Sequence, residues 1–385
     1  MKASNILSLV ATVLASKVAA ECFSEKLGFP CCVETKEVVN VDENGQWGIE
    51  NNNWCGIETV SVEQVSNEVE DVQFSDEEEQ VEFTNEQDVQ AQDESSEEET
   101  GSIEASPVSS DYMSKLQILN SCPMEARTKQ DGVKYPTSEK ITYHSNTTGT
   151  DRQMNIILPV DYDGTKKYPV VYYLHGIFGN EDSMLDETAI ALPVNLYNEG
   201  KAKEAIFVLP NTYAPPPGKE VVPDFNQDYF DGYDNFINEL IDDIMPYVEQ
   251  NYSVLTGKEN TGLCGFSMGG RNSLYIGYKR PDLFGYVGAF SPAPGVTPGD
   301  DFSGHHPGLF QESEFRTDVP PFVTLVSCGT NDSVVGTFPK SYHEILTTNG
   351  QEHIWFEVPG ADHDDKAIAA GLYNYLSTAF GVLDK

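Results

Sequence analysis

The chain is poor in basic residues. Its 385 residues include 23 Lys and Arg against 62 Asp and Glu, which gives a formal net charge of −39. Non-specific binding to the phosphates of a nucleic acid depends on Lys and Arg side chains, so this balance excludes it. We therefore expect no nucleic-acid partner.

The sequence also lacks an apolar run long enough to cross a bilayer, which takes ~20 residues. The run from Ile6 to Ala15 is too short, and no later run reaches the required length. It lies between Lys2 and the small residues Val18 and Ala20, an order typical of a secretory signal peptide cleaved after Ala20. We expect residues 1–20 to be this signal, the mature protein to be secreted and extracellular, and no membrane partner.

Acidic residues are concentrated between Glu58 and Asp111, where nineteen Asp or Glu occur and no Lys or Arg. Few aromatic residues accompany them, and like charges repel one another and extend a chain. The composition predicts a disordered, solvated linker over 59–114 rather than a cation-binding tract. This linker would separate a small module, 21–58, from a large domain, 115–385.

Four of the seven cysteines crowd into the small module: Cys22, Cys31, Cys32 and Cys55. In a secreted chain this density predicts two disulfides in a unit too small for much of a core. Because a bond between the adjacent Cys31 and Cys32 would be strained, each should pair with either Cys22 or Cys55, and the sequence does not choose between these connectivities. A zinc site is the alternative, but the spaced Cys-x₂-Cys pairs of such sites are missing.

The small module also has the pattern of a β-hairpin. Residues 38–41 and 46–49 are expected to be strands on either side of the turn Asn44-Gly45. Two of the three tryptophans, Trp47 and Trp54, lie in this unit. Exposed aromatic residues on a small rigid scaffold more often bind than pack, so they predict a binding module.

The stretches CFSEKLGFPCC and WGIENNNWCGI resemble the fungal dockerin family. Modules of that family attach plant-cell-wall enzymes to a scaffolding protein in anaerobic fungal cellulosomes. The resemblance covers about residues 22–57 and implies a cellulosomal scaffolding protein as the partner, contacted first by Trp47 and second by Trp54. A small cellulose-binding module, to which fungal dockerins are related in sequence, is the alternative.

From about residue 113 onward, short apolar runs alternate with amphipathic segments. Two antiparallel edge strands are expected at 137–144 and 151–158, and buried strands at 168–176, 205–211, 261–267, 285–292, 321–329 and 354–360. Helices are expected at 182–198, 234–250, 268–278, 340–348 and 365–379. This alternation predicts a doubly wound α/β fold whose mostly parallel sheet is covered on both faces. Cys264 and Cys328 should then be buried thiols, and Cys122 has no evident partner.

The stretch CGFSMGG contains the pattern G-x-S-x-G around Ser267. It follows an expected strand and precedes an expected helix, which is the setting of a nucleophile elbow. Gly265 and Gly269 would remove side chains where strand and helix approach each other around a sharply turned serine. We predict that Ser267 is a catalytic nucleophile.

A serine nucleophile needs a base, and the base needs a carboxylate that orients it. In this setting the chain order is serine, acid, histidine. Asp332 follows the expected strand 321–329, and His363 follows the last expected strand. Both would lie at the carboxyl edge of the sheet, where active sites of open α/β sheets are found. We predict Asp332 as the acid and His363 as the base.

The tetrahedral intermediate of such a reaction needs backbone N–H donors. We expect these donors to be Met268, directly after the nucleophile, and Ile177, in the loop LHGIFGNEDS, with Phe178 as the alternative to Ile177. His175 is interpreted as a structural hydrogen-bonding residue beneath that loop. A catalytic triad of this kind implies no metal and no organic cofactor.

Two Asn-x-Ser/Thr sequons, at Asn146 and Asn251, are the glycosylation sites expected in a secreted chain. A third, at Asn331, adjoins Asp332, where a glycan would block the site.

The blocks YYLHGIFGNEDS, LPNTY, GFSMGGRNSLYIGYKRPDLFGYVGAFSPAPG, SCGTNDSVV and PGADHDD, in this order, resemble carbohydrate esterase family one. The resemblance covers about residues 130–385 and implies an α/β-hydrolase fold and a serine esterase. The family includes feruloyl esterases, acetylxylan esterases and esterase D proteins, and its motifs support Asp332 and His363. One departure is Asp365, which stands where many members have an apolar residue.

Within that family we favour an enzyme that removes feruloyl groups from plant cell-wall arabinoxylan, with acetylated xylan as the alternative substrate. The candidate pocket residues are Phe178, Leu185, Pro292 and Phe338, and the proline-rich segment 212–225 is a candidate border of the groove. A serine peptidase is disfavoured, because the chain has no room for the propeller or cap domain that such enzymes usually carry. A non-catalytic scaffold- or cellulose-binding protein is the alternative from another class, but no triad member is missing.

Overall fold

In a computed structural model of the chain, the described residues are 24, 30–33, 35–36, 40–41, 45–50, 53–57, 103–105, 115–219 and 221–382. They belong to two compact units divided between Gln92 and Asp93, and each unit is described by itself. The expected signal peptide, residues 1–20, and most of the acidic segment lie outside the described residues. None of the helices in the described part of the chain has the length and apolar character needed to cross a membrane.

The small unit contains a three-stranded antiparallel sheet of β1 (Asn40–Val41), β2 (Gln46–Glu50) and β3 (Asn53–Ile57). The predicted hairpin is confirmed as β1 and β2, whereas β3, which pairs with β2, was not predicted. A disulfide joins Cys32 to Cys55, with 4.9 Å between their Cα atoms. This is one of the pairings that the sequence left open, and Cys22 lies outside the described residues.

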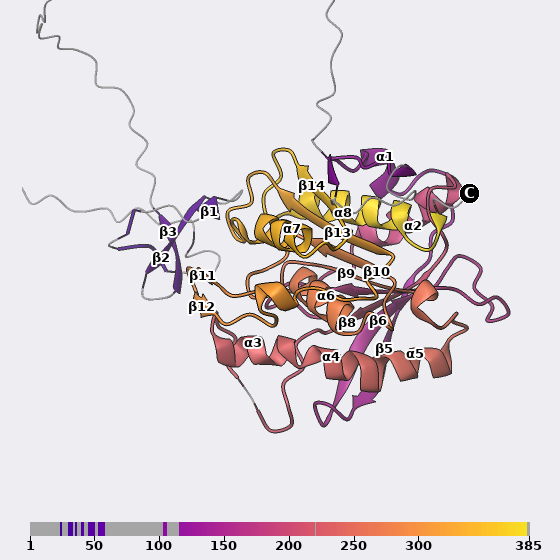
Figure 1. Cartoon of the computed structure of the whole chain (residues 1–385), viewed down its shortest axis with the longest axis horizontal. Helices are drawn as coiled ribbons and strands as arrows, with labels where there is room; N and C mark the ends of the chain where they lie inside the picture. Colours follow the sequence, from indigo (N-terminus) through magenta and orange to yellow (C-terminus); the bar gives the residue numbers. More distant parts are fainter. Residues whose placement is uncertain are drawn as a thin grey trace, which may run out of the picture. The chain divides into compact units, whose positions relative to one another are not determined.

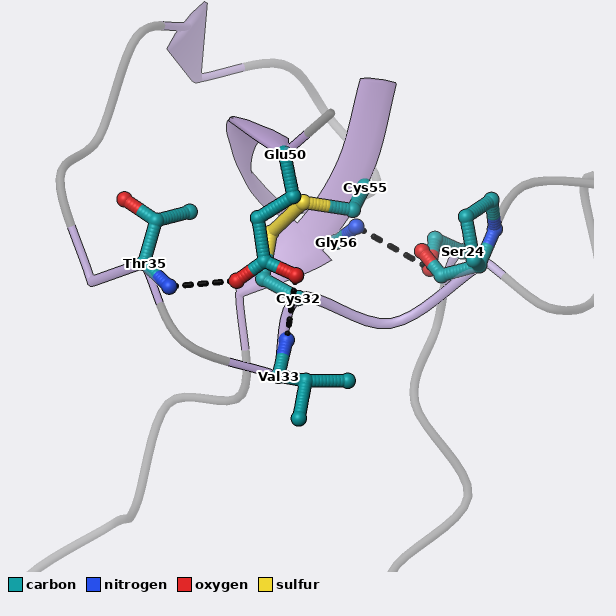
Figure 2. The surroundings of a disulfide bond; sticks show 8 residues. Ser24, Cys32, Val33, Thr35, Glu50, Cys55 and Gly56 are labelled. Carbon is teal, nitrogen blue, oxygen red and sulfur yellow. Dashed lines mark hydrogen bonds between the residues drawn. A yellow bond between two sulfur atoms is a disulfide. The ribbon is translucent and has the colours of Figure 1, made fainter. Parts of the chain in front are cut away.

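Hydrogen bonds tie the loop beside this disulfide to the sheet (Figure 2). The Glu50 carboxylate accepts from the backbone N–H of Val33, at 2.8 Å, and from that of Thr35. The hydroxyl of Ser24, which is buried, accepts from the N–H of Gly56 at 3.2 Å. A unit of this size buries little apolar surface, so the disulfide and these polar contacts are its main constraints.

The large unit is built on a nine-stranded sheet in the order β4-β14-β13-β10-β9-β7-β8-β6-β5 (Figure 1). The strands from β14 to β8 run parallel to one another. At one edge β4 pairs antiparallel with β14, and at the other β6 pairs antiparallel with both β8 and β5. A separate hairpin is formed by β11 (Gly299–Asp301) and β12 (Gly304–His306). The strands of the large sheet are β4 (Ile103–Ala105), β5 (Ser138–Ser145), β6 (Thr150–Ile157), β7 (Val170–Leu174), β8 (Ile206–Pro210), β9 (Thr261–Phe266), β10 (Tyr286–Phe290), β13 (Val323–Gly329) and β14 (Ile354–Val358).

Strand β4 is a correction to the sequence analysis, which placed Ile103–Ala105 in a disordered linker. These three residues instead pair antiparallel with β14, with Ile103 opposite Phe356. The backbone of β14 would otherwise have unpaired N–H and C=O groups at the edge of the sheet. A run of three residues inside an acidic segment is too short for its periodicity to predict a strand.

Helices cover both faces of the sheet (Figure 1). On one face α2 (Glu187–Asn198) and α8 (Asp365–Thr378) pack against each other and the sheet. The other helical elements of the described large unit are α1 (Met124–Arg127), α3 (Gln227–Asp234), α4 (Phe236–Glu239), the π-helical segment η3 (Leu240–Ile244), α5 (Met245–Asn251), the 3₁₀ turns η4 (Lys258–Asn260) and η5 (Glu312–Glu314), α6 (Met268–Lys279) and α7 (Phe338–Thr348). Residues of α4, η3, α5, α6 and α7 pack in the core clusters on the opposite face.

The side chains of β7, which point alternately to the two faces, show why helices must pack on both faces of the sheet. Val171 and Tyr173 belong to the core beneath α2 and α8, whereas Val170, Tyr172 and Leu174 belong to the core on the other face. Successive residues of a strand point to opposite faces, so an apolar run such as VVYYL is stable only when both faces are buried. The predicted doubly wound sheet is thus confirmed.

Both predicted core cysteines are buried, Cys264 on β9 and Cys328 on β13. Burial is the main cause that raises the pKa of the Cys328 thiol to about 12.

The sequence analysis missed two helices and one irregularity. The helix expected at 234–250 is divided into α4, η3 and α5, and Pro246 lies at the start of α5. Proline has no N–H and its ring crowds the preceding turn, which accounts for the local π-helical geometry. Helices α1 and α3 were not predicted, because the first is a single turn and the second, QDYFDGYD, has too little apolar periodicity.

A buried histidine pair joins α7 to the start of β14. His353 Nδ1–H donates to the carbonyl of Gln351 at 2.7 Å, and His343 Nδ1–H donates to His353 Nε2 at 2.7 Å. Burial is the main cause that lowers the pKa of His353 to about 4. The native state therefore holds this imidazole neutral.

We expect His353 to make the native state sensitive to acid. An unfolded chain binds this proton with a pKa of roughly 6.5, so between about pH 6.5 and pH 4 the unfolded state binds more protons and stability falls as the pH falls. The loss between pH 7 and pH 5 should be roughly 1–2 kcal/mol. Urea unfolding of wild type and of His353→Gln at both pH values measures this change. From pH 7 to pH 5 the free energy of unfolding of the variant should fall by about 1–2 kcal/mol less than that of wild type. An equal loss in both proteins would contradict the assignment.

Candidate active site

Ser267 lies on the turn between β9 and α6. Its backbone has φ 56° and ψ −119°, a positive φ that residues other than glycine rarely adopt. Its N–H donates to the carbonyl of Phe290 at 3.0 Å, and its own carbonyl accepts from the N–H groups of Arg271 and Ala293, each at 2.9 Å. Hydrogen bonds from the adjacent strand end and from the helix therefore hold this strained turn.

The two glycines of the motif are required by close backbone contacts. A Cβ at Gly269 would lie 2.3 Å from the carbonyl oxygen of Leu174, and a Cβ at Gly265 would lie 2.6 Å from the carbonyl carbon of Gly269. Real Cβ atoms do not approach other atoms this closely, so only glycine fits at either position. The spacing of G-x-S-x-G thus follows from the packing of β7, β9 and α6.

The predicted acid and base are hydrogen-bonded to each other. His363 Nδ1–H donates to Asp332 Oδ2 at 2.9 Å, and Asp332 Oδ1 accepts from the N–H groups of Val334 and Val335, each at 3.1 Å. The side chain of Asp332 is fully buried. Burial by itself would raise the pKa of Asp332, but the hydrogen bonds and charge of His363, with smaller contributions from Ser291 and Val335, outweigh it and lower the pKa. The carboxylate is therefore ionised and orients the imidazole.

The imidazole also lies beside the nucleophile strand. The ring centroids of His363 and Phe266 are 4.2 Å apart, and Phe266 directly precedes Ser267. The loops that follow β9, β13 and β14 therefore meet at the carboxyl edge of the sheet. A serine, an imidazole and an ionised carboxylate in this arrangement suit nucleophilic catalysis with general-base assistance.

Two backbone N–H groups next to Ser267 can bind an oxyanion. Met268 is the first residue of α6, so its N–H has no acceptor within the helix. The loop after β7 lies against the nucleophile, because a Cβ placed on Gly176 would be 3.2 Å from Ser267 Cβ. In that loop the N–H of Phe178 donates to the Tyr233 hydroxyl at 2.9 Å, whereas that of Ile177 has no acceptor among the described residues. This difference favours Ile177 over Phe178 as the second donor.

His175 hydrogen-bonds to the same loop and to the chain after β8. Its Nδ1–H donates to the Gly176 carbonyl at 2.6 Å, and its Nε2 accepts from the N–H of Thr212 at 2.8 Å. Burial is the main cause that lowers the pKa of His175 to about 4, which keeps the ring neutral and able to make both contacts. The imidazole therefore links the loop after β7 to the chain after β8.

Two of the four predicted pocket residues adjoin the nucleophile turn. Phe178 follows Ile177, is 46% exposed, and stacks on Tyr229 with ring centroids 5.5 Å apart. Pro292 is buried, and its Cα would lie 3.2 Å from a Cβ placed on Gly270, in the first turn of α6. Both residues therefore lie near the nucleophile turn, and their role in bordering an acyl group stays a prediction.

The other two predicted pocket residues pack elsewhere. Leu185 packs against the core beneath α2 and α8. The ring of Phe338 contacts those of His306 and Tyr342, with centroids 6.3 Å apart in each pair. No contact in the described part of the chain joins either residue to Ser267, and a lining role for them stays a prediction.

The structure adds residues that the sequence analysis did not name. Tyr229 and Tyr233 pack with Met268 beside the loop after β7 that contains Ile177, here called the oxyanion loop, and with Tyr213 of the segment 212–225. The spacing of Tyr229 and Tyr233, one helical turn apart, was the available signal. Ser291 is fully buried and has φ 42°, its hydroxyl donates to Cys328 Sγ at 3.9 Å, and it helps to lower the pKa of Asp332. Nothing in the sequence distinguishes Ser291 from other serines.

The predicted glycosylation sites differ in their surroundings. The side-chain amide of Asn146 donates to Asp243 at 2.9 Å, so attachment of a glycan there would disturb a contact that orders the β5–β6 turn. The exposed Asn251 donates to the carbonyl of Tyr247 at 2.8 Å, within its own helix. Of the two, Asn251 is the more accessible candidate.

Among the described residues, no cluster of three or more His, Cys, Asp or Glu side chains is arranged to hold a metal ion.

Two parts of the chain match known protein families. Residues 145–335, which include Ser267 and Asp332, match the family described as Putative esterase. Residues 21–57 match the family described as a cellulose or protein binding domain.

A solved structure matches most of the large unit. It is the structure of a CE1 ferulic acid esterase from Anaeromyces mucronatus in complex with ferulic acid. The two chains are 67% identical, with a TM-score of 0.69, over 70% of this chain and 99% of that chain.

Curated relatives match shorter stretches. Feruloyl esterase B of Piromyces equi is 56% identical over 59 residues, which are 15% of this chain and 11% of that protein. An endo-1,4-beta-xylanase/feruloyl esterase of Xylanibacter ruminicola is 30% identical over 167 residues, which are 41% of this chain and 22% of that protein. The chain thus spans between about a tenth and about a fifth of the length of these two relatives.

We expect a fluorophosphonate probe, which reacts with activated serines, to label Ser267. Asp332→Asn should slow labelling by about 10³- to 10⁴-fold, because the amide cannot hold the His363 ring as the buried carboxylate does. Labelling followed by peptide mass spectrometry measures this rate. Asp365→Asn is the matched control, because its exposed carboxylate lies two residues from His363 in the same segment. Equal labelling of the wild type and Asp332→Asn would exclude Asp332 as the orienting acid.

Proposed function

The chain belongs to the CE1 ferulic acid esterase family, and we propose on that basis that it is a secreted serine esterase that removes feruloyl groups from plant cell-wall arabinoxylan. The observation that carries this proposal is the 67% identity to a ferulic acid esterase over 99% of that enzyme's chain. The expected signal peptide and the match of residues 21–57 to a cellulose or protein binding domain are consistent with work outside the cell on a polysaccharide.

In the proposed mechanism, His363 takes the proton of the Ser267 hydroxyl as the oxygen attacks the ester carbonyl carbon. The intermediate collapses to an acyl-enzyme, and His363 gives the proton to the departing sugar oxygen. Water then attacks the acyl-enzyme with the same proton relay, which releases the carboxylic acid and restores Ser267. Asp332 holds the ring and stabilises its charged form, which is consistent with the 2.9 Å hydrogen bond between them.

The N–H groups of Met268 and Ile177 would stabilise the oxyanion in both steps. Removal of one such donor in other enzymes costs roughly 3–4 kcal/mol of transition-state stabilisation. The neutral His175 supports this role, since its bonds to Gly176 and Thr212 fix the loop that presents Ile177. Preorganised donors need not reorient as charge develops on the oxygen.

The aromatic side chains beside the nucleophile favour a feruloyl group over an acetyl group. Phe178 stacks on Tyr229 and meets the ring of Phe225 edge-on, with centroids 4.9 Å apart. Flat apolar rings gain contact area with a planar hydroxycinnamoyl group. An acetyl group would need only a small pocket and would leave these rings uncovered.

We expect wild type to hydrolyse methyl ferulate faster than acetylated xylan, and to leave a peptide substrate intact. Ser267→Ala should lower kcat on methyl ferulate by about 10⁴-fold or more, because the nucleophile is lost. Release of ferulic acid and of acetate, followed by chromatography, measures both reactions. Faster release of acetate would favour the acetylxylan esterase alternative. If wild type is inactive on all three substrates, the esterase proposal fails.

We also propose that residues 22–57 dock the enzyme to a cellulosomal scaffolding protein. The match of residues 21–57 to a cellulose or protein binding domain supports a binding role for this unit. The side chains of Trp47 and Trp54 lie outside the described residues, although their backbones form part of β2 and β3. Their proposed contact with the partner therefore rests on the sequence.

Trp47→Ala should weaken binding of the full chain to a purified scaffolding protein by about 10-fold or more, as expected for an aromatic residue that dominates an interface. Val33→Ala is the matched control, because Val33 lies in the same unit and is 87% exposed. Surface plasmon resonance gives both affinities, and a parallel assay with crystalline cellulose separates the two partners. Binding to cellulose but not to the scaffolding protein would make the polysaccharide, and not the scaffold, the partner of this unit.

A further inference from the structure

A polar cavity lies beyond the oxyanion loop, at the start of β6. Its volume is about 400 Å³, within the range of small-ligand sites. All seven of its lining residues are polar: Thr142, Thr150, Asp151, Arg152, Gln153, Glu181 and Asn211. An apolar aromatic group has nothing to pack against here, so this cavity is not a second site for a feruloyl ring.

The cavity opens at the same edge of the sheet as the nucleophile. From β9 the strand order is β7, β8 and then β6, whose first residue is Thr150. Because β6 is antiparallel to its neighbour β8, its start lies beside the carboxyl ends of the parallel strands. Three strand spacings of ~4.8 Å separate β6 from β9 by about 14 Å across the sheet.

Two lining residues are also linked to the oxyanion loop. Asn211 directly precedes Thr212, whose N–H donates to His175 Nε2 at 2.8 Å. Glu181 lies five residues after Gly176 in the loop that presents Ile177. The cavity therefore adjoins the loop that presents Ile177 and the segment that His175 binds.

Each charged group in the cavity has its own partner. Asp151 lies 2.9 Å from His144, Arg152 lies 2.5 Å from Glu239, and Glu181 lies 3.2 Å from Lys140. A free metal cation or phosphate would have to compete with these existing pairs. The cavity therefore does not select a ligand by charge.

The other groups of the cavity are neutral. Thr142, Thr150 and Gln153 are exposed. Gln153 Nε2–H donates to Thr142 Oγ1 at 3.5 Å, and the hydroxyls of Thr148 and Thr150 are hydrogen-bonded to each other at 2.9 Å. A hydroxyl or amide group that makes one such bond can still donate to or accept from a ligand. A neutral molecule with many hydroxyl groups matches this set, since each hydroxyl also donates and accepts. Sugar residues of a polysaccharide have this chemistry.

We propose that this cavity is a carbohydrate subsite, which holds sugar residues of the polysaccharide whose ester is cleaved at Ser267. The inference rests on the proposed esterase function and adds to it a place where the carbohydrate part of the substrate binds. It predicts a preference for esters carried on an oligosaccharide over esters of a simple alcohol.

The test compares kcat/KM for a feruloylated arabinoxylo-oligosaccharide with kcat/KM for methyl ferulate. In the double variant Thr142→Val/Gln153→Ala, the ratio of the two values should fall about 3- to 10-fold, the loss expected for one or two neutral hydrogen bonds. Both positions are exposed on the β5–β6 pair, so the fold should tolerate the changes.

Gln250→Ala is the matched control for the ratio. Gln250 lines another polar cavity, together with Tyr162 and Ser253. That cavity lies at the amino end of β7, since the carbonyl of Ser253 accepts from the N–H of Tyr168, ahead of the strand. This variant should leave the ratio as in the wild type.

A binding measurement separates this inference from the esterase proposal. In the full chain carrying Ser267→Ala, NMR titration with an unesterified arabinoxylo-oligosaccharide should give a Kd that rises about 3- to 10-fold when Thr142→Val/Gln153→Ala is added. An unchanged Kd together with an unchanged kcat/KM ratio would overturn the subsite while leaving the esterase function standing. Loss of ester hydrolysis in the wild type would instead overturn the esterase function, and the titration would still report on the cavity.

Discussion

The close approach of three backbone segments around Ser267 is the constraint on which the active site depends. The end of β7, the end of β9 and the first turn of α6 meet where Gly265 and Gly269 have no Cβ, and any side chain there would overlap a neighbouring backbone. That approach forces the positive φ of Ser267 and lifts its side chain out of the strand direction. It also brings the loop of Gly176 and Ile177 against the nucleophile. Backbone packing therefore already requires the glycines of the G-x-S-x-G motif, before any catalytic role is considered.

The rest of the site follows from where the parallel strands end. The chain passes from β7 to β8 on one side of β7 and returns to β9 on the other, so the strand order reverses between β7 and β9, which is where ligands bind in open α/β sheets. The nucleophile follows β9, and the oxyanion loop follows β7. Asp332 lies on the loop after β13, and His363 lies on the loop after β14. Hydrogen bonds to the Asp332 carboxylate keep it ionised despite its burial.

The two units are stabilised in different ways. The large unit buries apolar side chains on both faces of its sheet, and the alternating residues of β7 show both cores. The small unit relies on the Cys32–Cys55 disulfide and on the Glu50 carboxylate, which binds the loop that follows Cys32 (Figure 2). Small size limits the apolar area that a unit can bury, so covalent and polar constraints take a larger share there.

The amino-acid sequence by itself determined the elements with strong local signals. The apolar runs predicted the central strands, the Asn-Gly turn predicted the first hairpin, and the glycine spacing around Ser267 predicted the nucleophile turn. Chain order was enough to propose Asp332 and His363, because the order of elements in a parallel sheet dictates which loops share an edge. Strand β4, helix α3 and the π-helical segment escaped prediction, because their signals are short or depend on partners distant in the sequence.

Only the tertiary structure decided which groups touch. The hydrogen bond of the Phe178 N–H to Tyr233, which favours Ile177 as a donor, joins residues 55 positions apart. The support of Asp332 by Ser291 and the polar cavity beside β6 likewise arise between segments with no common local pattern. Local sequence fixes backbone preference and burial through side-chain periodicity, whereas contacts across loops depend on how the whole sheet is ordered and twisted.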